Sequence, residues 1–112
     1  MTNRRKDSRV RMSRKLKPIP AAFRTDRMRG EGHVASLSSR GLFVASGSLP
    51  EPGEFVTVVF SDRSGSKIEV CGIVRWTTDQ LPPEKCSKSG FGMYLEFVSD
   101  DYREFYEELL TS

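Results

Sequence analysis

Short segments in which apolar and polar residues alternate recur along the chain from residue 21 onward, and turn-forming residues separate them. Side chains of a β-strand point in turn to opposite faces of a sheet, so this period of two predicts strands rather than helices. The predicted strands are Ala21–Thr25, His33–Leu37, Leu42–Ala45, Phe55–Phe60, Lys67–Trp76 and Phe91–Val98. Their short and regular spacing favours an antiparallel β-domain.

Two of these strands are expected to supply much of the core. In the strand that ends at Trp76, the predicted inward face holds Ile68, Val70, Val74 and Trp76. In the last predicted strand, the residues that share one face are Phe91, Met93, Leu95 and Phe97. Because large apolar side chains favour pleated, buried surfaces, we expect both sets to point into the core.

The apolar period changes near the end of the chain. Ser99 is a residue type that caps helices, and the two aspartates after it are favoured at a helix N-terminus. Beyond them the apolar residues recur at helical spacing, at Tyr102, Phe105, Tyr106 and Leu109. We therefore predict one amphipathic helix at about residues 100–110.

Six strands and one terminal helix predict an all-β fold with a single helix, namely a six-stranded antiparallel β-barrel whose open end the C-terminal α-helix covers. Composition alone also allows an oligonucleotide-binding fold or an SH3-like barrel. The chain has 112 residues, which is enough for one core and not for two. We expect the folded domain to span residues 18–112, with a polar loop between Thr77 and Gly90.

The N-terminal segment, residues 1–17, contains eight Lys or Arg side chains and no steady apolar period. Residues 1–29 hold 11 Lys or Arg against 2 Asp, a balance of +9, whereas residues 30–112 hold 7 cationic against 13 acidic side chains, a balance of −6. Polar, strongly charged segments do not bury enough apolar surface to fold alone. We therefore predict a basic, mobile segment ahead of the barrel.

Several classes of function find no support in the residues. The longest apolar run, Phe55–Phe60, is far shorter than the roughly 18 residues of a membrane span, and the N-terminus lacks the apolar stretch of a secretory signal, so we expect a cytoplasmic protein. Cys71, Cys86 and His33 show no metal-binding spacing, which argues against a metal site. Because the sequence has neither a nucleophile elbow nor a phosphate loop with lysine, we expect no enzyme and no cofactor.

Two short motifs stand out, one in the basic segment and one between the second and third predicted strands. Arg5 and Arg9 form an RxxxR pattern, and Ser38 and Gly41 form an SxxG pattern within SLSSRG. In this order the motifs resemble those of the PilZ domain, a bacterial receptor domain for the second messenger cyclic di-GMP. The segments GIVRW and GFGMYLEF also resemble the GxVxW-type and GxGVxF-type strands of that family. The resemblance extends over nearly the whole chain from Arg4.

The resemblance implies a six-stranded barrel with a C-terminal helix, and a ligand held between the basic segment and the turn after the second strand. An arginine fork meets a phosphate or a guanine O6/N7 edge with two hydrogen bonds, and Arg5 and Arg9 supply two forks. The Ser38 hydroxyl can donate or accept, Gly41 lets backbone approach a flat ligand closely, and Arg4 is a candidate for stacking on a base. We expect binding to order the basic segment and to signal to a protein partner whose identity the sequence does not indicate.

One position departs from the family pattern. Ser36 stands where the family carries Asp or Asn, and its short hydroxyl does not accept two guanine N–H donors in a fork as a carboxylate does. Losing one charge-assisted contact costs about 1.5–3 kcal/mol. This difference keeps a second hypothesis open, a ligand-free PilZ-like adaptor that acts through protein contacts. A third hypothesis, an RNA- or single-strand-binding barrel, is disfavoured because most aromatic residues fall at predicted core positions.

Overall fold

The computed structural model describes residues 10–11, 19–62, 64–80 and 89–110. Its elements are β1 (Val10–Arg11), β2 (Ile19–Arg24), β3 (Arg29–Ser38), β4 (Gly41–Ala45), β5 (Phe55–Ser61), β6 (Lys67–Thr77), a 3-10 turn (Thr78–Gln80), β7 (Gly90–Phe97) and α1 (Asp100–Leu110). The six predicted strands and the predicted helix are all found, with some ends shifted by a few residues. Within the described ranges, no helix is long and apolar enough to span a membrane.

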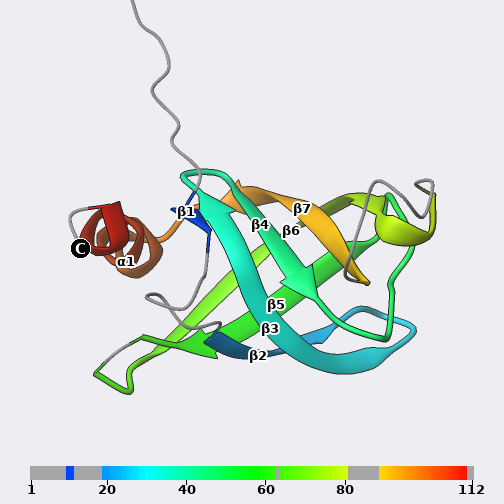
Figure 1. Ribbon diagram of the computed structural model, residues 1–112, viewed down its shortest axis with the longest axis horizontal. Helices are drawn as coiled ribbons and strands as arrows, with labels where there is room; N and C mark the ends of the chain where they lie inside the picture. Colours follow the sequence, from blue (N-terminus) through cyan, green and yellow to red (C-terminus); the bar gives the residue numbers. More distant parts are fainter. Residues whose placement is uncertain (1–9, 12–18, 63, 81–88, 111–112) are drawn as a thin grey trace, which may run out of the picture.

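β3 closes the sheet into a barrel because it pairs along both of its edges. The described strands follow the order β1-β3-β2-β5-β6-β7-β4, and a further pairing of β3 with β4 closes the ring of the last six strands in this order. Every pairing is antiparallel. Strands β2 to β7 make the closed barrel, and α1 lies at one end of it (Figure 1). The predicted six-stranded antiparallel barrel with a C-terminal helix is therefore confirmed.

The apolar faces of all six barrel strands fill the interior. From α1, the residues at helical spacing are buried as predicted, namely Tyr102, Phe105, Tyr106 and Leu109. The ring centroids of Phe60 and Phe105 lie 5.3 Å apart, so the helix packs directly against the barrel. Burial of a side chain such as Leu or Phe contributes about 1.5–3 kcal/mol relative to leaving it in water.

Two β-bulges between β6 and β7 overturn part of the predicted core. The register shifts between Val74 and Trp76, and again between Cys71 and Gly72. A bulge adds one residue to one strand, so the residues beyond it change face. Trp76 is consequently 40% exposed and Phe97 is 71% exposed, so the prediction that they point into the core was wrong. The other residues of the two predicted inward faces are buried.

Two short elements were not expected from the alternation of residues. β1 lies within the segment predicted to be mobile, and it pairs with β3. Apart from β1, residues 1–17 lie outside the described part of the chain, so the mobility of this segment stays a prediction. The 3-10 turn follows β6 directly, in the region predicted as a polar loop, and residues 81–88 of that region also lie outside the described part.

The substitution Gly72→Ala is expected to destabilise the barrel, because β6 and β7 approach closely at the bulge. A Cβ atom on Gly72 would lie 2.0 Å from the Tyr94 carbonyl oxygen, which belongs to the backbone and cannot move aside alone. We expect urea denaturation to show a loss of about 1–3 kcal/mol, as for other overpacked interiors. Gly47→Ala is the matched control, since a Cβ there meets nothing within 4 Å. Equal stability of the two variants would contradict the close approach.

Candidate ligand-binding face at the β3–β4 turn

The SxxG motif forms the turn between β3 and β4. Ser38, the last residue of β3, lies opposite Gly41, the first residue of β4. Ser38 is 8% exposed, and Gly41 is also buried. Unlike Gly53 and Gly65, Gly41 has no positive φ, so the turn does not use the left-handed conformation that glycine permits. The role predicted for Gly41, to let the backbone approach a flat ligand closely, stays a prediction.

Tyr102 of α1 holds this turn in place. The residue is fully buried, and its hydroxyl oxygen lies 2.6 Å from the carbonyl oxygen of Ser38 and 3.3 Å from that of Gly41. Because a hydroxyl has one proton, the shorter contact with Ser38 is the main hydrogen bond. Ser99 caps α1 by accepting a hydrogen bond from Tyr102 N at 3.1 Å. The C-terminal helix therefore positions a turn that lies far from it in the sequence.

Arg40, inside the motif, joins the turn to β7. Its backbone oxygen accepts a hydrogen bond from Leu95 N at 2.9 Å, and its Nη1 donates to Leu95 O at 3.1 Å. The turn is thus supported by α1 and by β7. Such support favours binding, because a preorganised backbone loses less conformational entropy when a ligand arrives.

β1 brings the N-terminal part of the chain to the same place. Val10 lies opposite Leu37 and Arg11 lies opposite Ser36, so β1 runs beside the last residues of β3. Outside the described residues lie the three arginines predicted to bind the ligand, Arg4, Arg5 and Arg9. The chain that follows the RxxxR motif therefore pairs with the strand that leads into the SxxG turn.

A row of residues crosses the strands beside Ser36. The row consists of Ser36 on β3, Phe43 on β4, Gly92 on β7 and Trp76 on β6. The rings of Phe43 and Trp76 stack, with centroids 5.3 Å apart and planes inclined by 18°. Gly92 makes room for this stack, because a Cβ atom there would lie 2.3 Å from Trp76 Nε1. Ser36 therefore belongs to the same row as a flat aromatic surface.

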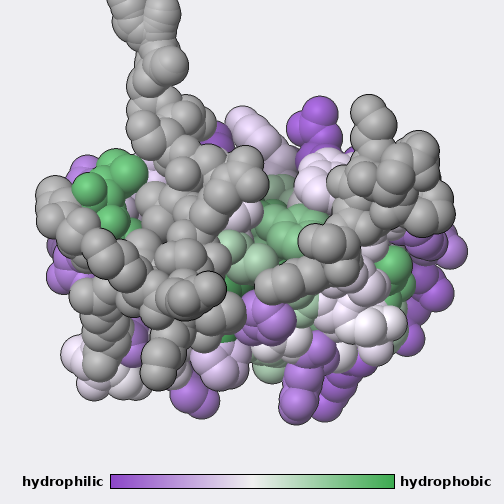
Figure 2. All heavy atoms as spheres, in the orientation of Figure 1, coloured by the Kyte–Doolittle hydropathy of each residue, from purple (hydrophilic) through white to green (hydrophobic). Residues whose placement is uncertain are grey.

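The aromatic pair was missed in the sequence. Phe43 alternates with the buried residues Leu42 and Val44, so its outward position was readable from the alternation that predicted β4. Trp76 was assigned to the core because nothing in its local sequence marks the bulge before it. Figure 2 shows apolar side chains at the centre of the face on which β3 and β4 lie in front. The hydrogen bond of Tyr102 to the turn was also missed, although its burial was predicted.

Solved structures that share this fold include an inhibitor of motility and a PilZ domain. The inhibitor of motility MotI/DgrA from Bacillus subtilis has a TM-score of 0.72 at 15% sequence identity, covering 97% of this chain and 51% of that one. The PilZ domain of YcgR from Escherichia coli, solved with c-di-GMP, has a TM-score of 0.70 at 9% identity, covering 97% of this chain and 91% of that one. This chain thus spans about half the length of the Bacillus protein, and identities this low show the shared fold alone.

Family membership is clear from the sequence match. The PilZ domain family matches residues 3–111, which is nearly the whole chain. The chain therefore belongs to the PilZ domain family. No curated protein matches it.

Tyr102→Phe is expected to lower the free energy of unfolding by about 1–3 kcal/mol, because the buried Ser38 carbonyl loses the hydroxyl donor at 2.6 Å. Thermal or urea unfolding measures the difference. Tyr94→Phe is the matched control, since Tyr94 is 40% exposed, and a surface change of this kind stays within about 0.5 kcal/mol. If the two variants are equally stable, the hydroxyl of Tyr102 does not hold the turn.

Proposed function

We propose that this chain is a non-catalytic receptor module for cyclic di-GMP, which it holds between the RxxxR segment and the turn formed by Ser38 and Gly41. Two observations support this class of ligand: the chain belongs to the PilZ family, and the structurally similar YcgR domain was solved with c-di-GMP. The observation that carries the proposal is the pairing of β1 with β3. It joins the chain next to the RxxxR motif to the strand that ends in the SxxG turn.

The length of the chain limits how far the two arginine forks can lie from β1. Arg9 is bonded directly to Val10, which lies opposite Leu37. Arg5 precedes Val10 by five residues, so its Cα stays within about 18 Å of Val10 even if the chain is fully extended. A guanidinium fork meets a phosphate with two charge-assisted hydrogen bonds, and two forks suit a ligand with two phosphates.

The surface of Phe43 and Trp76 suits a guanine base of the same ligand. It lies in one row with Ser36, so a base stacked there can turn its polar edge toward that residue. Base stacking on aromatic rings contributes about 1–3 kcal/mol per base. The proposed contacts are therefore Arg4, Arg5, Arg9, Ser36, Ser38, Gly41, Phe43 and Trp76.

The proposed response is ordering of the basic segment. The eight Lys or Arg side chains in residues 1–17 repel one another, and a bound dianion reduces that repulsion. The turn between β3 and β4 would gain less order on binding, because Tyr102 and Arg40 already hold it. A downstream protein partner would then sense the ordered segment. One observation favours the alternative, a ligand-free adaptor, namely Ser36 in place of Asp or Asn.

Titration calorimetry is expected to show binding of cyclic di-GMP, and Arg5→Ala and Arg9→Ala are each expected to weaken it by roughly 10–150-fold. This range corresponds to the loss of about 1.5–3 kcal/mol for one charge-assisted contact. Arg14→Ala is the matched control, because it removes the same charge from the same segment outside the motif.

Equal binding by the wild type and the Arg5→Ala/Arg9→Ala double variant would refute the assignment. GMP and single-stranded RNA serve as ligand controls. The proposed ordering has its own readout in hydrogen exchange. On addition of cyclic di-GMP, new protection is expected near Arg4–Arg9, a smaller gain in Leu37–Gly41, and little change in Phe91–Phe97. Complete protection before the ligand is added would contradict an ordering step.

Ser36→Asp is expected to tighten binding by about tenfold or more, because a carboxylate accepts two guanine N–H donors with charge-assisted hydrogen bonds. The same titration measures the change, and Ser39→Asp controls for an added charge in the turn. Unchanged affinity would show that residue 36 does not contact the base. Binding by Ser36→Asp alone, and not by the wild type, would favour the adaptor hypothesis for the natural protein.

A further inference from the structure

Large side chains lie exposed on the outer faces of β5, β6 and β7. Phe55 is 53% exposed, Tyr94 is 40% exposed and Phe97 is 71% exposed. Arg40 and Arg75 lie beside them and are exposed as well. We call these five residues the basic aromatic surface.

The strand registers make this surface continuous. Phe55 lies opposite Ile73, and Ile73 lies opposite Tyr94, so one row crosses the three strands. Phe97 lies opposite Cys71, which is two positions from Ile73 along β6 and therefore faces the same side. Both Ile73 and Cys71 are partly exposed there. The apolar area thus extends without interruption from Phe55 to Phe97.

A β-bulge places Phe97 on this surface. Without the register shift at Cys71 and Gly72, strict alternation would put Phe97 on the inward face together with Leu95. Bulges commonly re-aim a side chain in this way. Here the bulge leaves most of a phenylalanine ring in water, at the edge of an apolar area that spans three strands. Continuous exposed apolar areas rimmed by polar residues mark interaction sites.

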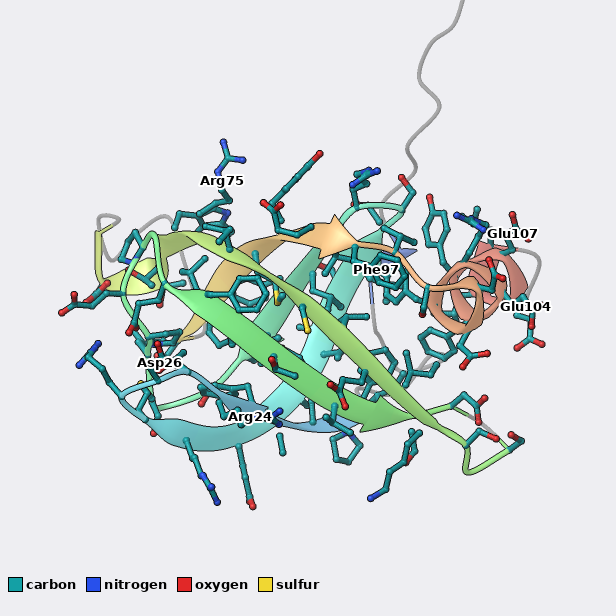
Figure 3. The ribbon with its side chains drawn as sticks, turned by 180° about the vertical axis from the view of Figure 1, so that it is seen from behind. Arg24, Asp26, Arg75, Phe97, Glu104 and Glu107 are labelled. Atoms are coloured by element: carbon teal, nitrogen blue, oxygen red, sulfur yellow. The ribbon has the colours of Figure 1, made fainter. Side chains whose placement is uncertain are left out.

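Two arginines give the surface its positive charge. The Cζ atoms of Arg40 and Arg75 lie 5.8 and 5.7 Å from the centroid of the Tyr94 ring, so one ring carries two mutually repelling cations. In the described ranges neither guanidinium forms an ion pair, whereas Arg27 and Arg103 pair with carboxylates. Figure 3 shows Arg75 pointing outward from the barrel. Both cations are therefore available to an acidic group from outside.

We propose that the basic aromatic surface docks a segment of a partner protein in which carboxylates stand next to apolar side chains. The carboxylates would meet the two guanidinium groups, and the apolar side chains would cover Phe55, Tyr94 and Phe97. Aromatic residues and arginine are the types that contribute most at protein interfaces. Two exposed carboxylates lie near this surface, Glu96 on β7 and Glu69 two positions before Cys71 on β6, so its positive charge is concentrated at Tyr94, where Arg40 and Arg75 meet.

Two other occupants suit this surface less well. A twofold contact with a second copy sets the same patch against itself and brings four guanidinium groups together. The carboxylates of α1 do not offset this repulsion, because Glu104 and Glu107 project from the side of α1 that faces away from Phe97 (Figure 3). A single-stranded nucleic acid needs a track of cations along its backbone, and this surface supplies two.

Arg40 connects the docking surface with the turn of the candidate ligand site. It lies between Ser38 and Gly41, and its backbone and guanidinium group both bond to Leu95. A dianion bound at the turn would screen the charge of Arg40 and so oppose an acidic partner. This link rests on the proposed function, whereas the docking itself does not.

Selection from a random dodecapeptide phage library on the immobilised full chain, without cyclic di-GMP, tests the docking proposal. We expect the enriched peptides to be acidic and to contain large apolar residues. For a synthetic peptide of the enriched sequence, fluorescence anisotropy is expected to show at least about tenfold weaker binding to Phe97→Ser and to Arg75→Glu, as for contacts at the centre of an interface. Leu110→Ser and Arg103→Glu are the matched controls, because they change an exposed leucine and an exposed arginine of α1. All variants are first checked for an unchanged melting temperature.

No enrichment, enrichment of basic peptides, or equal losses in the test and control variants would overturn the proposal. Sedimentation that shows a dimer dissociated by Phe97→Ser would assign the surface to a second copy instead. Competition by oligouridylate would assign it to nucleic acid. The Arg5→Ala/Arg9→Ala variant is expected to keep its peptide binding, so failure of the ligand assignment is distinguishable from failure of the docking. Repeating the titration with cyclic di-GMP tests the link through Arg40.

Discussion

The described residues of the candidate site are arranged around β3, the strand that pairs along both edges. Its first part pairs with β2 from Arg29 to Val34, its last part pairs with β1 at Ser36 and Leu37, and β4 pairs with the opposite edge. Buried backbone donors and acceptors need partners, so β1 continues the edge that β2 leaves unpaired. This is why the chain that leads out of the basic segment lies beside the turn that follows β3. A short strand of two residues thereby brings the chain that follows the RxxxR motif beside the strand that leads into the SxxG turn.

The outer surfaces are shaped by glycines and bulges in β6 and β7. A Cβ atom would lie 2.5 Å from Phe43 Cζ if added to Gly90, and 2.3 Å from Trp76 Nε1 if added to Gly92. These glycines therefore admit an aromatic stack on the outside of a sheet whose inside is already filled. Beyond the bulge at Gly72, Phe97 is turned outward. The family-type glycine pattern of β7 is thus explained by the aromatic side chains that lie over it.

The sequence predicted the parts of the fold that strict periodicity controls. The burial of Tyr102 and Leu109 on α1, and of Val70 and Leu95 in the barrel, follows from spacing alone. A bulge adds a residue without a local signal, which is why the prediction for Phe97 was wrong. The turn residues Ser38 and Gly41 were found by motif. The hydrogen bond from the Tyr102 hydroxyl to this turn was not predicted, because a contact between residues 64 positions apart leaves no pattern in the sequence.

The β1–β3 pairing and the β3–β4 turn form the two sides of the candidate ligand site, and they differ in the free energy needed to disrupt them. β1 adds only two residues to the sheet. Fixing a residue costs about 1–2 kcal/mol of backbone entropy, and a hydrogen bond returns about 0.5–1.5 kcal/mol, so a pairing this short is close to balance on its own. The turn is different, because displacing it breaks the buried bond from Tyr102 to Ser38 and both contacts of Arg40 with Leu95. A ligand with modest binding energy therefore shifts the population of the β1–β3 pairing far more readily than it moves the turn. A ligand bound at the turn would accordingly act on Arg40 through its charge and not by moving it, since the backbone of Arg40 is already bonded to Leu95 of β7.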